Sequence, residues 1–277
     1  MRLGALCLTE PQAGSDIAAI TTTARRDGGG WVLDGRKQFI TNGGIADVHV
    51  VFARVADEGG TAAFIVEGDA PGLSMGRKEE KLGMRASHTA EVVFEGCRVP
   101  LTNRLETRLT ARTPAAASAR PDEELSGAAT ALTLLQYSRM TFAAAALGVA
   151  RAAFEYARDY ALERRAFGVP IARHQLVSAK LAQMAMEIEA ARALLWRAGW
   201  IALSGRPLAL AEGSMAKCMT ADVAVHCCEE AVQILGGHGY VRDHPVEKWY
   251  RDAKLYQIWE GTNEIQRLVI ARAITSR

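Results

Sequence analysis

The first 100 residues consist of short apolar runs, rich in Val, Ile, Phe and Thr, that Gly and Asp separate. Such runs are typical of β-strands, and no long helical pattern interrupts them. Asp34-Gly35 indicates a hairpin turn, and Pro71-Gly72 indicates a second turn. We therefore predict a compact antiparallel β-barrel or sandwich. The strands expected are 31–33, 48–53, 62–66 and 91–94.

From about residue 129 to the end, apolar residues recur at spacings of three and four, while Gly and Pro become sparse. This pattern predicts long helices with short connections, which pack as an antiparallel four-helix-type bundle. The fold class expected is therefore α+β. The predicted helices cover about 129–165, 174–203, 207–235 and 262–274, with a shorter helix after Pro245.

Residues 101–128 differ in composition from the segments on either side. The stretch from Thr113 to Pro121 is rich in alanine and bounded by proline, which indicates a connector or an inserted loop. The predicted organisation is a β-domain at 1–100, a connector at 101–128 and a helical domain at 129–277.

Composition narrows the class of protein. Of the 277 residues, 49% are hydrophobic, and 33 Lys and Arg nearly balance 31 Asp and Glu, so the basic excess of a nucleic-acid-binding protein is missing. No apolar run of about 18 residues predicts a membrane span, and the N-terminus lacks a signal peptide, so a cytoplasmic protein is expected. The five irregularly spaced cysteines predict reduced thiols, with neither a disulfide framework nor a metal site.

Glu260 is the carboxylate with the most suggestive surroundings. It lies between Trp259 and Gly261 at a break between helical stretches, before a predicted helix cap at Thr262. Neighbouring apolar side chains, among them Ile258, would partly desolvate the carboxylate, raise its pKa and make it a general base. An ordinary glutamate at a helix start, favoured by the helix dipole, is the simpler explanation of the same residues. The local sequence leaves both interpretations open.

The segment Ile258–Gln266 resembles the active-site signature of the acyl-CoA dehydrogenase family. Further segments resemble family motifs in the same order along the chain, and together they correspond to the middle β-domain and the C-terminal helical domain of that family. No dinucleotide-binding glycine motif follows a strand. The further segments are 8–16, 35–43, 163–168, 174–175 and 233–240.

The resemblance implies an FAD-dependent α,β-dehydrogenation that converts an acyl-CoA thioester to the trans-2-enoyl-CoA, as in fatty acid beta-oxidation and lipid metabolism. Glu260 would remove the α-proton while a hydride leaves the β-carbon for flavin N5. The α-proton of a thioester is weakly acidic, so donors must stabilise the enolate-like oxygen. In the family these donors are a flavin ribityl hydroxyl and the backbone N–H of the catalytic glutamate.

The resemblance also implies a set of FAD contacts. Apolar and hydroxyl side chains near the first two motifs would meet the flavin ring, with Phe39 packed against it and Thr41 near N5. Arg164 would pair with the diphosphate, assisted by Gln175 across a subunit interface. Read without the family, these residues are ordinary core strands, a solvated arginine and a glycine helix stop. The full set is Leu6, Leu8, Thr9, Phe39, Thr41, Arg164, Phe167, Gln175, Gln233, Gly236, Gly237, Thr262 and Glu264.

Substrate contacts are implied for Ser15 beside the coenzyme A arm, for Arg139 near the thioester, and for Gly261 and Arg272. Both arginines could equally be cations on a helix surface. Gln136 stands where the family typically has an aspartate, which weakens the expectation of coenzyme contacts there.

The implied partners are the acyl-CoA, an electron-transferring flavoprotein as electron acceptor, and further copies in a homodimer or homotetramer. The first motif begins at residue 8, so the helical domain that precedes it in the family is expected to be absent or supplied by another chain in a hetero-oligomer. Two alternatives stay open: a truncated or degenerate homologue that acts as a non-catalytic partner subunit, and a flavin acyl-CoA oxidase.

Overall fold

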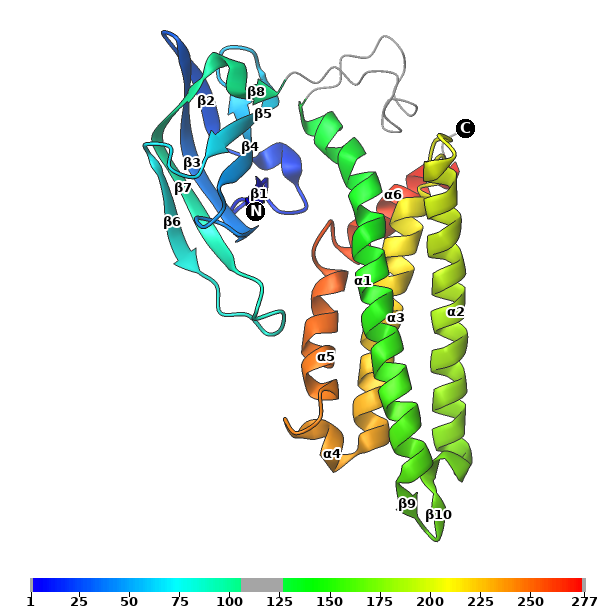
Figure 1. Ribbon diagram of the computed structural model, residues 1–277. Coiled ribbons are helices and arrows are strands. Elements are labelled where there is room, and N and C mark those ends of the chain that lie inside the picture. The colour runs from blue at the N-terminus through cyan, green and yellow to red at the C-terminus, as the bar shows by residue number, and fades with distance from the viewer. Residues whose placement is uncertain (1, 106–126, 276–277) are drawn as a thin grey trace. The chain divides into compact units, whose positions relative to one another are not determined.

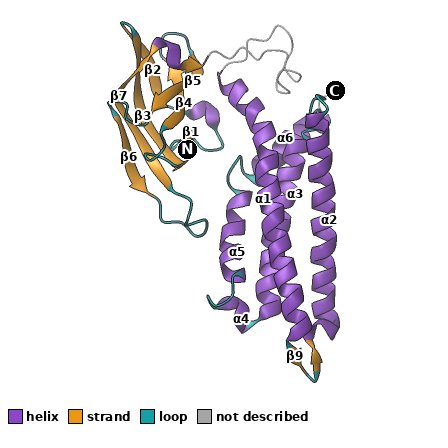
Figure 2. Cartoon of the chain, in the orientation of Figure 1, coloured by secondary structure: helices purple, strands orange, loops and turns teal. Residues whose placement is uncertain are grey.

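The computed structural model describes residues 2–105 and 127–275, with the side chains of 127–134 and 136 outside the description. The chain divides into two compact units (Figure 1). One holds the strands of a single large sheet, and the other holds the helices (Figure 2). This arrangement confirms the predicted α+β class. Most of the predicted connector, residues 106–126, lies outside the described residues.

The first unit is built on an eight-stranded sheet in the order β6-β7-β3-β2-β4-β5-β8, with β1 paired to β4. Most neighbours are antiparallel, as predicted, but β1–β4 and β2–β4 are parallel. All four predicted strand positions fall within observed strands. The strands are β1 (Gly4–Cys7), β2 (Thr23–Asp27), β3 (Gly30–Thr41), β4 (Val48–Val55), β5 (Gly60–Glu67), β6 (Leu73–Lys78), β7 (Thr89–Pro100) and β8 (Arg104–Leu105).

The hairpin predicted at Asp34-Gly35 is wrong, because β3 runs straight through these two residues. Gly35 instead lies at a register shift against β7, where its φ is +150° and an added Cβ would lie 2.5 Å from Thr22 Oγ1. The glycine therefore serves a bulge and a close approach. The β2–β3 turn lies at Gly28-Gly29, whereas the turn predicted at Pro71-Gly72 is confirmed.

The second unit is a bundle whose long helices match the predicted ranges, although α3 starts five residues later than expected. A short hairpin, β9 (Arg165–Ala166) and β10 (Val169–Pro170), joins α1 to α2. In the part of the chain that the structure describes, no helix is long and apolar enough to cross a membrane. The helices are α1 (Gly127–Glu163), α2 (Gln175–Leu203), α3 (Glu212–Leu235), α4 (Gly237–Tyr240), α5 (Val246–Ala253) and α6 (Asn263–Thr275).

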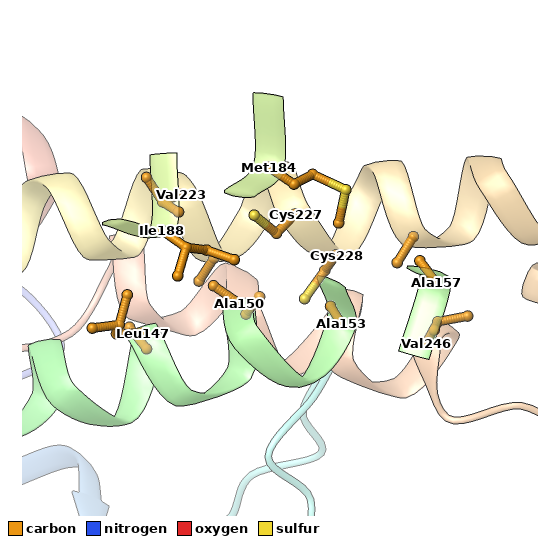
Figure 3. Packing of buried hydrophobic residues seen from close by; sticks show 14 of the residues in the cluster. Leu147, Ala150, Ala153, Ala157, Met184, Ile188, Val223, Cys227, Cys228 and Val246 are labelled. Carbon is orange, nitrogen blue, oxygen red and sulfur yellow. The ribbon is translucent and has the colours of Figure 1, made fainter. Parts of the chain in front are cut away.

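Small side chains fill the core of the bundle. Helix α1 presents a stripe of buried alanines at spacings of three and four, which marks one face of a helix. Met184 and Ile188 of α2 and Cys227 and Cys228 of α3 pack against this stripe (Figure 3). Alanine lets helix backbones approach closely, so the bundle is held by close packing. The stripe is Ala146, Ala150, Ala153, Ala157 and Ala161.

Candidate active site

Glu260 and Gly261 form the turn between a 3-10 helix (Lys254–Gln257) and α6. Both have positive φ, +55° for Glu260 and +82° for Gly261. A glutamate rarely adopts this left-handed conformation, so the surrounding contacts must hold it there. Thr262 Oγ1 accepts the Ile265 N–H at 3.3 Å, which confirms the predicted helix cap.

The Glu260 carboxylate is half-buried, and its Oε2 lies 2.9 Å from Ser138 Oγ of α1. Burial raises the pKa of Glu260, although the Ser138 hydrogen bond and the charges of Arg139 and Lys217 oppose this rise. The direction is the one expected for a partly desolvated carboxylate. Trp259 packs edge-on against Phe142 at 4.8 Å between ring centroids, while Ile258 is 52% exposed.

Buried donors converge on the main chain of this turn. The carbonyl oxygen of Glu260 accepts hydrogen bonds from Arg139 Nε at 3.3 Å and from Gln266 Nε2 at 3.1 Å. The carbonyl oxygen of Gly261 accepts from Lys217 Nζ at 2.8 Å and from Gln266 Nε2 at 3.0 Å. Two successive carbonyls are thus each held by two donors.

Arg139, expected near the thioester, lies inside the bundle beside the Glu260 turn. Its side chain is only 4% exposed, and its guanidinium donates to the Glu260 carbonyl and, at 3.1 Å, to Ser214 Oγ. Burial lowers the pKa of Arg139, which the charge of Glu260 partly offsets. The structure therefore directs its hydrogen bonds to the protein.

The sequence did not predict Ser138, Lys217 and Gln266 as residues of this site. They come from α1, α3 and α6 and meet only in the folded chain. A signal was present for Lys217, since it is a lone charge in an apolar stretch of Ala, Met and Cys. Lys and Glu are rarely buried without a partner, so such a lysine indicates a buried acceptor.

The residues expected beside the flavin ring form a connected surface on the first unit. The Gln38 N–H donates to the Thr9 carbonyl at 2.9 Å, and Asn42 Nδ2 donates to the Gly4 carbonyl at 3.1 Å. These bonds join the segment containing Leu6, Leu8 and Thr9 to the end of β3, which carries Phe39 and Thr41. Strand β1 ends at Cys7, so Leu8 and Thr9 lie just beyond the observed strand.

Phe39 is the most unusual residue of this surface. Its φ is +58°, it sits at a register shift in the pairing of β3 with β7, and its ring is 60% exposed. Leu6 and Thr41 are exposed as well. The alternative of an aromatic in the core is thus wrong: Phe39 is an apolar ring at the surface of this unit, which suits contact with a flat ligand.

A buried ion pair fixes the segment that follows β1. Lys37 Nζ lies 2.8 Å from Glu10 Oε1, and both side chains are almost fully buried. Burial acts to raise the pKa of Glu10, but the hydrogen bonds from Lys37, Thr22 and Thr21 outweigh it and lower the pKa to about 2. Lys37 also donates to the Leu8 carbonyl at 3.1 Å. The pair therefore ties this segment to β3.

Six further FAD candidates, Arg164, Phe167, Gln175, Gln233, Gly236 and Gly237, lie at the end of the helical unit where α1 ends, α2 begins and α3 ends. Phe167 is 95% exposed and packs edge-on against His174 at 5.7 Å between ring centroids. Gly236 has a φ of +60° and terminates α3, as the alternative reading of a helix stop predicted. Also exposed at this end are Arg164, Gln175, Gln233 and Gly237.

This end of the unit is distant from Glu260. Lys217, which contacts the Glu260 turn, and Gln233 lie sixteen residues apart on α3, about 24 Å along a helix axis. Figure 1 shows α3 spanning the bundle between the start of α6 and the α4 end. The predicted cofactor residues of the helical unit thus fall into two separate groups.

The other predicted residues lie at the surface. Ser15 is exposed in the loop before a 3-10 helix at Ile17–Ala19, and Glu264 and Arg272 are exposed on α6. The side chain of Gln136 is outside the described part of the chain. Among the described residues, no group of His, Cys, Asp and Glu side chains could hold a metal ion.

Comparisons with known proteins match both units. The sequence profile of the acyl-CoA dehydrogenase middle domain matches residues 5–97, and that of the acyl-CoA dehydrogenase C-terminal domain matches residues 126–275. An acyl-CoA dehydrogenase of Bacillus subtilis is 47% identical over 273 residues, which cover 98% of this chain and 68% of the relative.

The rat mitochondrial short-chain specific acyl-CoA dehydrogenase is 43% identical over 98% of this chain, which spans 62% of that relative's length. Among solved structures, a glutaryl-CoA dehydrogenase from Mycobacterium smegmatis in complex with FADH2 has a TM-score of 0.87 and 30% identity. The match covers 100% of this chain and 66% of that one. The chain therefore spans about two thirds of the proteins that it resembles.

Proposed function

Because the chain belongs to the acyl-CoA dehydrogenase family, we propose that it carries out the FAD-dependent α,β-dehydrogenation of an acyl-CoA thioester, with Glu260 as the base. The observation that supports this role most is the state of the Glu260 carboxylate. The carboxylate is half-buried, and burial raises its pKa. Glu260 lies in a turn whose two carbonyl groups accept four hydrogen bonds. A fixed carboxylate with a raised pKa suits proton abstraction near neutral pH.

The residues of the first unit fit the ring of a flavin. Exposed Leu6 and Phe39 offer apolar contact, and Thr9 and Thr41 offer hydroxyl groups beside it. When bound, FAD supplies the acceptor for the hydride that leaves the β-carbon. The fit rests on an exposed aromatic ring and on hydroxyls carried by two hydrogen-bonded segments.

The protein's own task in the reaction is to make a weakly acidic α-proton removable. Glu260 takes that proton on its carboxylate, and its backbone N–H donates to the thioester oxygen, where negative charge develops. Ser15, Gly261 and Arg272 are proposed to contact the coenzyme A thioester. Arg139 is proposed to hold the Glu260 turn through its hydrogen bond to the Glu260 carbonyl.

The residues proposed to serve the FAD of a second copy of the chain are Arg164, Phe167, Gln175, Gln233, Gly236 and Gly237. Their distance from Glu260 along α3 supports an arrangement in which two copies share each cofactor. Thr262 and Glu264 complete the set on the Glu260 side. An electron-transferring flavoprotein is the proposed electron acceptor, and the short-chain specific relative favours a short acyl group as substrate.

The test is anaerobic titration of the FAD-loaded chain with acyl-CoAs of graded length, comparing wild type with Glu260→Gln. We expect wild type to bleach the flavin absorbance and Glu260→Gln to slow this reduction by about 10⁴-fold or more, because the amide cannot accept the proton. Glu229→Gln, an exposed carboxylate of α3, is the control and should match wild type.

Each alternative gives a different result. A non-catalytic partner subunit would leave the flavin oxidised in wild type, even after reconstitution with FAD. An oxidase would release hydrogen peroxide during aerobic turnover in amounts that match the product. Reduction of Glu260→Gln at the wild-type rate would contradict the assignment of the base.

A further inference from the structure

We propose that Lys217 is a positioning residue that fixes the backbone turn carrying Glu260 and so sets where its carboxylate meets the α-proton. The inference rests on the proposed role of Glu260 as the base. It concerns a residue of α3 that lies outside the sequence motifs and touches no atom of the carboxylate by hydrogen bond.

The first observation is where the ammonium group lies. The side chain of Lys217 is 2% exposed, so its charge is placed inside the bundle. Its Nζ donates to the Gly261 carbonyl at 2.8 Å and to Asn263 Oδ1 at 3.0 Å. Lys217 thus bridges the turn and the first residue of α6. A buried ammonium is retained only where its donors are used, as they are here.

The second observation is the strained backbone conformation that these hydrogen bonds hold in place. Glu260 and Gly261 both have positive φ, which is an unfavourable backbone conformation for a glutamate. Gln266 Nε2 lies so close that a Cβ on Gly261 would approach it to 2.5 Å. Strained turns persist when their surroundings over-determine them, and Lys217 supplies one of the few donors available to do so.

The third observation is the charge environment. Arg139 of α1, Asp222 of α3 and Glu260 all act on Lys217, and burial, the largest influence, lowers its pKa to about 8. Asn263 Nδ2 in turn donates to Asp222 Oδ1 at 2.8 Å. The ammonium therefore joins the turn to a polar network in the core, which no apolar side chain of the same length could do.

The first experiment needs no cofactor. In the full 277-residue chain, amide hydrogen exchange of residues 260–263 is compared among wild type, Lys217→Met and Lys180→Met. Lys180 is the matched control, because it is a lysine of the same bundle whose ammonium bonds elsewhere, to Glu230, between α2 and α3. We expect exchange in the turn to accelerate about tenfold or more in Lys217→Met alone. Equal exchange in Lys217→Met and wild type would overturn the proposal.

The second experiment separates positioning from general stability. With FAD bound, we expect Lys217→Met to reduce the flavin about 10²-fold more slowly while binding acyl-CoA with unchanged affinity, since small misplacements of a base have effects of that size. An acyl-CoA with sulfur in place of the β-carbon can lose its α-proton but cannot give up a hydride. Its deprotonation should weaken in Lys217→Met and stay normal in Lys180→Met.

The outcomes are distinguishable. If wild type itself fails to reduce the flavin, the proposed function fails, and the exchange experiment still decides whether Lys217 holds the turn. If wild type is active and Lys217→Met reduces flavin at the same rate, the positioning role is wrong. If Lys217→Met does not fold, Lys217→Leu, which also lacks a donor, takes its place in both experiments with the same criteria.

Discussion

At the scale of single residues, the protonation of Glu260 is a balance between burial and a few nearby donors. Burial disfavours the carboxylate, whereas Ser138, Arg139 and Lys217 favour it, and burial prevails. Ser138 is the only one of the three that donates to a carboxylate oxygen. Its Oγ also lies 3.2 Å from the Leu135 carbonyl, but the shorter contact is to Glu260.

Ser138→Ala should therefore raise the pKa of Glu260 further. A hydrogen bond to a charged group contributes about 1.5–3 kcal/mol, so the shift should be on the order of one pH unit. A base must be ionised to act. The acid limb of the profile of kcat/KM against pH should therefore shift to higher pH. The plateau at higher pH should be little changed.

Ser138→Thr is the matched control, because it keeps a hydroxyl at the same place and should keep the wild-type profile. A downward shift in Ser138→Ala, or none, would show that the hydroxyl does not tune the carboxylate.

The residues of this site differ in how far the sequence could predict them. Glu260 and Thr262 carry local signals, an apolar neighbour and a capping position, and both behave as these signals indicate. Ser138 and Lys217 lie more than forty residues away from the turn in sequence. Their hydrogen bonds depend on how α1 and α3 pack, which periodicity alone does not encode.

At the scale of elements, the Glu10–Lys37 pair decides how the segment after β1 lies on β3. The segment has no regular strand pairing of its own beyond Cys7, and the pair together with the Leu8 carbonyl supplies the missing attachment. Phe39 and Thr41 follow Lys37 on the same strand. Loss of the pair should therefore loosen the surface proposed to meet the flavin.

Glu10→Gln should lower the free energy of unfolding at neutral pH by about 3–5 kcal/mol, because it leaves Lys37 buried without its counter-charge. The folded pKa of Glu10, about 2, is below its ordinary value of 4.5. The contribution of Glu10 is thus complete above pH 4.5 and is lost as pH falls towards 2. Denaturant unfolding should show the difference from wild type shrinking over that range.

Glu67→Gln, an exposed glutamate of β5, serves as the control and should change little. Adding Lys37→Met to Glu10→Gln should recover part of the loss, since no buried charge then stays unpaired. A constant difference from pH 7 to pH 2 would count against the pair as its source.

Elements were predictable where their signal is local. The long helices and the four strand positions follow from periodicity and composition. The hairpin predicted at Asp34-Gly35 was wrong because the same two residues suit a hairpin turn or a β-bulge. Only the close approach of Thr22 to Gly35 selects the bulge. The parallel pairings of β1 and β2 with β4 were not predictable, since a strand's side-chain pattern is the same in either direction.

At the scale of the whole molecule, the helical unit carries its candidate cofactor residues at two ends. The Glu260 turn is at one end, and Arg164, Gln175 and Gln233 are at the other, about 24 Å away along α3. A cofactor shared between two copies would use the first group from one copy and the second group from its partner.

This arrangement predicts complementation between two inactive chains. Glu260→Gln and Arg164→Met should each be inactive alone, the second through loss of flavin. Co-expressed, they should restore activity in about one quarter of the sites, because half of a random mixture of dimers is mixed and one site of each mixed dimer is intact. Flavin content and flavin reduction of the co-purified mixture measure this fraction. If the co-expressed mixture recovers no activity, all the groups of one site belong to the same chain.

The separation of these two groups has a consequence for how the protein holds its flavin in solution. If each cofactor is bound by two copies, its affinity depends on the concentration of the protein itself, because dilution dissociates the copies and divides the site. The chain should then lose flavin on dilution and regain it on concentration. The fraction of flavin that the protein retains would then indicate its oligomeric state as directly as a measurement of molecular mass.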